Sequence, residues 1–113
     1  DIPTFRKTQA DEDRETKLLS DWVKSLPEPF ASQMTALYAE MDALKTPEAK
    51  LYKSIDKLEA VIQHNEAPLT TWLPRERTLN LTYADENVAF SPYLTALRKA
   101  IRAETEKKLA DGD

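Results

Sequence analysis

The side chain with the clearest capacity for chemistry is Asp56, in the middle third of the stretch TPEAKLYKSIDKLEAVIQ at residues 46–63. A carboxylate in this place could bind a divalent cation or form an ion pair with Lys53, three residues earlier. An exposed pair at this spacing stabilises a helix by only about 0.2–0.5 kcal/mol. From spacing alone the ion pair is the simpler interpretation, and the metal site stays open beside it.

His64 is the only histidine of the chain. A metal site with two imidazole ligands therefore cannot be completed from this sequence alone. His64 follows the same predicted helix, where we expect it to interact with the negative end of the helix dipole rather than to bind a metal. No GxSxG turn accompanies the histidine, so the sequence does not support Ser-His-Asp catalysis.

Other acidic and aromatic side chains have an ordinary structural interpretation beside a functional one. Glu40, Asp42 and Glu48 could join a metal cluster, but they are equally natural as surface charges around a turn between helices. Aromatic side chains could stack on a base, although packing in the core is their commoner role. The aromatic candidates are Trp22, Tyr38, Tyr52, Trp72, Tyr83, Phe90 and Tyr93.

Composition excludes several classes of function. The 113 residues include no cysteine, so a disulfide or a thiolate zinc site is impossible, and a cytoplasmic location is expected. The net charge of -4 argues against nucleic acid as a partner. The one glycine, at position 112, cannot form a P-loop or a dinucleotide-binding loop. No apolar run approaches the roughly 20 residues that cross a bilayer, so no membrane partner is expected.

The hydrophobic periodicity predicts an all-α fold in one domain, residues 1–113, with four main helices. They are expected at about 11–25, 30–44, 46–63 and 92–109. Thr46 and Ser91 each precede a proline and are predicted N-caps. The stretch from about 68 to 87 should be mostly loop, with one short helix near 70–75.

Each predicted helix carries an apolar stripe that we expect to face the core. The stripes are Leu18, Leu19, Trp22, Val23 and Leu26; Phe30, Met34, Leu37, Tyr38, Met41 and Leu44; Leu51, Ile55, Leu58 and Ile62; and Tyr93 or Leu94 with Leu97 and Ile101.

Two stretches in combination resemble HD-domain phosphohydrolases. DIPT, residues 1–4, is similar to the family's GD(I/L)PT turn from the position after its glycine, and SIDKLEAVIQ places Asp56 at the family's closing aspartate. The similarity continues through TWLP and ENVAFSPYL and so covers nearly the whole chain. The branch that contains 5'-deoxynucleotidase-like proteins is the most similar. The resemblance implies an HD-domain-like helical bundle, of which residues 1–113 would be the C-terminal portion.

The resemblance also implies a chemistry. In that family two histidines and two aspartates hold a divalent ion such as Mn, Co or Mg, and phosphate is removed from a (deoxy)nucleoside 5'-monophosphate. Asp56 would be a metal ligand, Asp1 a catalytic and substrate-binding residue, and Ile2, Pro3 and Thr4 would line the nucleotide site. The family's upstream His and His-Asp doublet are not in this sequence. We therefore expect the isolated chain to be inactive.

A non-catalytic alternative remains open. The apolar stripes could instead bind a partner helix, in which case the chain would be a helical protein-interaction module. Exposed apolar faces favour association, so both interpretations predict a homodimer. Metal content would separate them.

Overall fold

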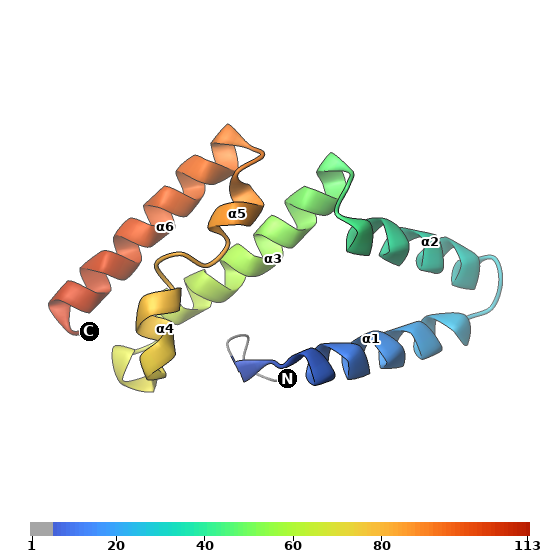
Figure 1. The fold of residues 1–113 in the computed structure, drawn as a ribbon, viewed down its shortest axis with the longest axis horizontal. Helices are drawn as coiled ribbons and strands as arrows, with labels where there is room; N and C mark the ends of the chain where they lie inside the picture. Colours follow the sequence, from blue (N-terminus) through green and yellow to red (C-terminus); the bar gives the residue numbers. More distant parts are fainter. Residues whose placement is uncertain (1–5) are drawn as a thin grey trace. The chain divides into compact units, whose positions relative to one another are not determined.

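The computed structural model describes residues 6–113, and within that range every regular element is a helix (Figure 1). The all-α fold class is therefore confirmed. Residues 1–5 lie outside the described part. The chain divides into two compact units, Asp1–Ala49 and Lys50–Asp113.

The first unit is an antiparallel hairpin of α1, Gln9–Lys24, and α2, Phe30–Ala43 (Figure 1). A capping box starts α1, because Thr8 Oγ1 accepts a hydrogen bond from the Asp11 N–H and the Asp11 carboxylate accepts one from the Thr8 N–H. This box places the helix start about two residues before the predicted one. The backbone of Leu44 turns left-handed, with φ of 53°, and ends α2.

The hairpin has a very small core. Val23 and Ala31 are its buried side chains within α1 and α2, while Met34, Tyr38 and Met41 are half-buried. The prediction that whole apolar stripes of these helices face a core was wrong, because each helix contacts the other along one face only. The exposed members of those stripes are Leu18, Leu19, Trp22, Phe30, Leu37 and Leu44.

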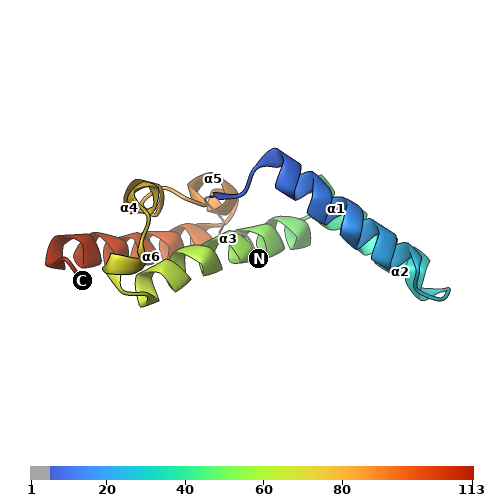
Figure 2. The same cartoon turned by 90° about the horizontal axis from the view of Figure 1, so that it is seen from below.

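The second unit contains most of α3, Pro47–Glu66, followed by the 3₁₀ helix η2, Leu69–Thr71, and by α4, Pro74–Leu79, α5, Asp85–Val88, and α6, Pro92–Asp111. α3 and α6 lie side by side and run in the same direction, and α4 and α5 lie on one side of that pair (Figures 1 and 2).

The helix limits predicted for α3 and α6 are confirmed to within a turn. Ser91 caps α6 by accepting a hydrogen bond from the Leu94 N–H, and Thr46 accepts one from the Ala49 N–H at the start of α3. The prediction of one short helix near residues 70–75 was wrong. Three short helices lie between α3 and α6, and the second of them begins with Pro74 at its first position.

The core of the second unit joins α3, α5 and α6. Its buried apolar residues are Leu58, Val61, Ala84, Val88, Leu94 and Ile101, with Tyr83 packed against them. On α6 the expected Leu94 and Ile101 are buried, whereas Tyr93 and Leu97 are exposed.

The predicted inward stripe of α3 was mostly wrong. Only Leu58 of that stripe is buried, because α3 carries apolar residues on two adjacent faces and the other elements cover the face of Ser54, Leu58 and Val61. Leu51, Ile55 and Ile62 are therefore exposed. None of the helices in residues 6–113 combines the length and the apolar character that crossing a membrane requires.

Candidate functional site

Asp56 lies on the uncovered face of α3. Its side chain is 61 % exposed, and Oδ2 lies 4.0 Å from Nζ of Lys53. The ion pair between Asp56 and Lys53 that the sequence suggested is therefore present, at the longest distance that still counts as an ion pair. Both side chains are exposed, so solvent screens their attraction. Such a weak partner leaves the carboxylate accessible to a cation.

A second carboxylate shares this surface. A shallow hollow on α3 is lined by Tyr52, Ile55, Asp56 and Glu59. Asp56 and Glu59 are three residues apart, so their side chains lie on the same face of the helix. Sequence reasoning missed Glu59, although this spacing was a signal that could have found it. Carboxylate oxygens are suitable ligands for hard divalent cations.

Apolar side chains surround the two carboxylates. Leu51, Tyr52, Ile55 and Ile62 have exposed fractions of 44, 55, 52 and 36 % respectively. A segment packed against these side chains would remove water from around Asp56 and would strengthen its attraction to a cation. The hollow is therefore suited to form one side of a cation-binding site that such a segment would complete.

The described residues do not provide a complete set of metal ligands. Within residues 6–113 no group of three His, Cys, Asp or Glu side chains could hold a metal ion. Glu40, Asp42 and Glu48 consequently do not form the cluster considered above, and Glu40 instead accepts a hydrogen bond from the Thr46 hydroxyl at 2.8 Å. The role of Asp56 as a metal ligand stays a prediction.

The four residues with predicted roles in the turn, Asp1, Ile2, Pro3 and Thr4, lie outside the described residues. Their catalytic and substrate-binding roles therefore also stay predictions.

His64 lies in the last turn of α3, as predicted, but its side chain joins a polar network. Nδ1 lies 2.9 Å from Oδ1 of Asn80, and Nε2 lies 3.8 Å from Oε1 of the buried Glu76. The carbonyl of His64 accepts a hydrogen bond from Nε1 of Trp72 at 2.8 Å. Trp72 is buried, which favours its structural role over base stacking.

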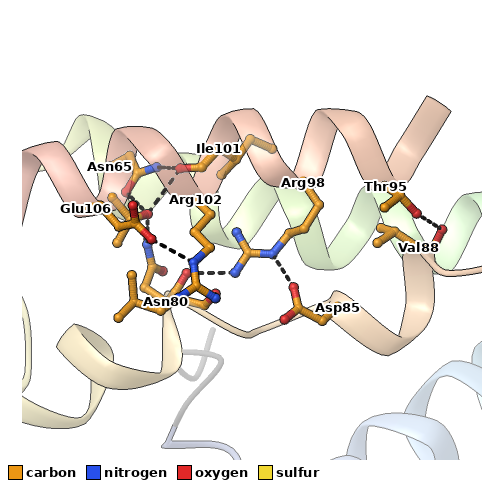
Figure 3. Close-up of polar contacts among 11 residues, drawn as sticks. Asn65, Asn80, Asp85, Val88, Thr95, Arg98, Ile101, Arg102 and Glu106 are labelled. Atoms are coloured by element: carbon orange, nitrogen blue, oxygen red, sulfur yellow. Dashed lines mark hydrogen bonds and ion pairs between the residues drawn. The ribbon is translucent and has the colours of Figure 1, made fainter. Parts of the chain in front are cut away.

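Asn80 is at the centre of this network and is fully buried (Figure 3). Its Nδ2 donates to Asn65 Oδ1 and to Thr105 Oγ1, at 3.1 and 3.0 Å. Thr105 Oγ1 in turn donates to Asn65 Oδ1 at 2.8 Å. α3, α6 and the end of α4 are thus joined by polar groups that satisfy one another.

Arg98 holds the other end of the network and is almost fully buried (Figure 3). Its Nε donates to Asp85 Oδ1 at 3.0 Å, and Nη2 donates to the Asn80 carbonyl at 2.9 Å. Nη1 has no hydrogen-bond partner among the described residues. The ion pair between Arg98 of α6 and Asp85 of α5 holds these two helices together, on the side of α3 that packs into the core.

Ser54 fixes the first half of α3. The side chain is fully buried, and its hydroxyl contacts the carbonyls of Lys50 and Asn87 at 2.8 and 2.9 Å. Together with the contacts of Asn65, this contact holds α3 at two points along its length. The face that carries Asp56 and Glu59 is therefore presented outward from a fixed helix.

Comparison with known proteins gives one match. A family model described as "HD domain" matches residues 1–98, which is most of the chain. No curated protein and no solved structure gives a significant match.

Proposed function

The chain belongs to the HD domain family, and we propose that it contributes Asp56 as one ligand of the divalent-metal centre of a phosphohydrolase. HD domains are generally metal-dependent hydrolases. The observation that carries the proposal is the accessible Asp56 carboxylate beside Glu59, within an exposed apolar surface on a helix held from its opposite face.

The metal, when bound, would supply an activated water and would neutralise charge on the phosphoryl group. Asp56 would provide a hard, anionic oxygen ligand from a fixed helix. The pairing with Lys53 would not prevent this, because an exposed ion pair at 4.0 Å contributes little. Glu59 would add negative charge near the ion and could accept a hydrogen bond from a metal-bound water.

The imidazole ligands of the centre must come from residues other than those described. The chain has one histidine, and the side chain of His64 lies in the network with Asn80 and Glu76. We propose that a segment carrying the family's His and His-Asp motif packs on the apolar surface around Asp56. The metal would be Mn, Co, Mg or a similar divalent ion.

The substrate proposed for the centre is a (deoxy)nucleoside 5'-monophosphate. The similarity of DIPT and SIDKLEAVIQ to the 5'-deoxynucleotidase-like branch supports this choice. Asp1 would act on the phosphate ester, and Ile2, Pro3 and Thr4 would line the nucleotide site. We further propose a homodimer located in the cytoplasm.

Phosphate release tests the proposed reaction. The chain alone, incubated with deoxynucleoside 5'-monophosphates and Mn, Co or Mg, should release no phosphate above background, because it lacks the imidazole ligands. The same chain with the His and His-Asp segment supplied should release phosphate and should lose this activity with a chelator. Turnover by the chain alone, or no turnover with the segment supplied, would contradict the proposal.

A second candidate function is a helical interaction module without chemistry. The exposed large apolar side chains of both units favour it, because patches of this kind mark sites of association. The module would gain no stoichiometric metal when the His and His-Asp segment is supplied, which distinguishes it from the hydrolase.

A further inference from the structure

The shallow hollow beside Asp56 has an aromatic side chain in its lining. Its lining residues share one face of α3, because they lie at spacings typical of a single helical face; they are Tyr52, Ile55, Asp56 and Glu59. Tyr52 is exposed and does not belong to the buried core cluster of the second unit. Its ring is therefore accessible to a ligand that enters the hollow.

Tyr52 and Asp56 lie one turn apart on this face. Side chains on an α-helix lean toward its N-terminus, so each residue covers the surface over the turn before its own Cα. Asp56 follows Tyr52 by four positions, and by this rule its carboxylate lies over the turn of Tyr52. The ring of Tyr52 then lies about one turn, roughly 5.4 Å, further along α3. A ligand bound to a cation on Asp56 would have this ring beside it.

The other aromatic side chains are placed differently. Among residues 6–113, Tyr52 is the aromatic residue that lines the hollow with Asp56. Trp72 is buried, and Tyr83 packs against the core of the second unit. Of the aromatic side chains considered for base stacking, Tyr52 is thus the one that shares a surface with the candidate metal ligand.

We propose that Tyr52 stacks on the base of the nucleotide substrate, while the phosphate of the same substrate binds the metal held by Asp56. This inference rests on the proposed phosphohydrolase function and names the residue that would bind the nucleoside part of its substrate. The ribose that joins base and phosphate has a length comparable with the separation of one turn between the ring and the carboxylate.

Charge supports this division of the substrate. Asp56 and Glu59 are carboxylates that repel a phosphate unless a cation lies between them and it. The base is uncharged, and an aromatic ring binds it through stacking without a counter-charge. The hollow therefore offers a cation-dependent position for the phosphate and a cation-independent position for the base.

Substitution of Tyr52 tests the stacking in the chain with the His and His-Asp segment supplied. Tyr52→Ala should raise KM for deoxyadenosine 5'-monophosphate at least about fivefold and leave kcat within about twofold, because stacking acts equally in the ground and transition states. Tyr52→Phe keeps the aromatic ring and should keep the wild-type KM and kcat. A fall of more than about tenfold in kcat in Tyr52→Phe would show that the hydroxyl acts in the reaction and would overturn the proposal.

A substrate without a base separates this inference from the proposed function. Wild type and Tyr52→Ala should release phosphate equally well from 2-deoxyribose 5-phosphate, since it offers nothing to stack on the ring. An equal rise of KM for both substrates in Tyr52→Ala would overturn the inference and leave the proposed function standing. No phosphate release by wild type from either substrate would contradict the proposed function, and the inference with it.

The preference among bases gives a second signature of stacking. Purines present a larger face to an aromatic ring than pyrimidines do, so wild type should have a lower KM for deoxyadenosine 5'-monophosphate than for deoxycytidine 5'-monophosphate. Tyr52→Ala should lose most of this difference. An unchanged difference in Tyr52→Ala would show that the base binds elsewhere and would overturn the proposal.

Tyr93 of α6 provides the matched control. It is 78 % exposed, belongs to the same unit and does not line the hollow. Tyr93→Ala removes the same side chain from the surface and should leave KM for deoxyadenosine 5'-monophosphate unchanged. A rise of KM equal to that in Tyr52→Ala would overturn the assignment of Tyr52 as the stacking residue.

Discussion

Asp56 and Lys53 form the loosest ion pair on α3, with 4.0 Å between Oδ2 and Nζ and with both side chains substantially exposed. The pair gives each charge a partner, but it contributes little to the stability of the fold. A residue that does little for stability, on a helix held rigidly from its other face, is free to serve binding.

Substitution of Asp56 should therefore leave stability unchanged. Asp56→Asn is expected to change the free energy of unfolding by less than about 0.5 kcal/mol, because it removes only a screened surface pair. Urea denaturation followed by circular dichroism measures this, with Lys53→Gln as the matched variant. A loss of more than about 1.5 kcal/mol would show that Asp56 is structural.

Asn80 should be the most sensitive polar residue of the second unit. Asn80→Ala removes hydrogen bonds with His64, Asn65 and Thr105 from the middle of a buried polar network, for an expected loss of about 2–4 kcal/mol in the free energy of unfolding. Asn87→Ala is the matched control, since the contact of Asn87 with Ser54 uses its backbone carbonyl. Equal losses in the two variants would contradict the central place of Asn80.

The two partners of the Arg98–Asp85 pair should respond unequally. Arg98 has a side chain 4 % exposed, whereas that of Asp85 is 46 % exposed. Asp85→Asn leaves a buried guanidinium without its counter-ion and should cost about 3 kcal/mol, while Arg98→Met leaves a carboxylate that water can solvate and should cost less. Thermal unfolding of both variants measures the difference. A larger loss in Arg98→Met would show that the packing and hydrogen bonds of Arg98 outweigh the pairing.

Acid should loosen the start of α1. Hydrogen bonds from the Thr8 N–H and hydroxyl lower the pKa of Asp11 below its ordinary value of 3.8. Because the folded-state pKa is the lower one, the contribution of Asp11 to stability is present above about pH 4 and is lost as the pH falls through the folded pKa.

The carboxyl chemical shift of Asp11, followed by NMR during an acid titration, measures this pKa. Thr8→Ala should raise it toward 3.8, because the hydroxyl donor is removed. An unchanged midpoint in Thr8→Ala would show that the hydroxyl contributes little to the capping box.

Much of the fold could be predicted from the sequence, and the failures have physical causes. The limits of α2, α3 and α6 followed from proline, cap residues and apolar spacing, which act locally. The buried face of α3 did not follow, because Leu51, Ile55 and Leu58 form as regular a stripe as Ser54, Leu58 and Val61. Only packing of α5 and α6 decides between two such faces.

The polar network around Asn80 could not be predicted from the sequence either. Asn65, Asn80 and Thr105 are polar and far apart in sequence, and sequence patterns assign such residues to the surface. The short helices α4 and α5 are too brief for apolar periodicity to reveal them. Asp56 was predicted as a metal ligand from its resemblance to a family motif. Glu59 was recognised only from the structure, which places it beside Asp56 on the surface of α3.

The most direct test of the account is the metal content of the chain with the family's His and His-Asp segment supplied. Wild type should retain about one divalent ion per chain after gel filtration, by inductively coupled plasma mass spectrometry. Asp56→Asn should lose most of this metal and with it phosphate release, whereas Lys53→Gln should keep both. Full metal occupancy and full activity in Asp56→Asn would contradict the assignment of Asp56 as a ligand.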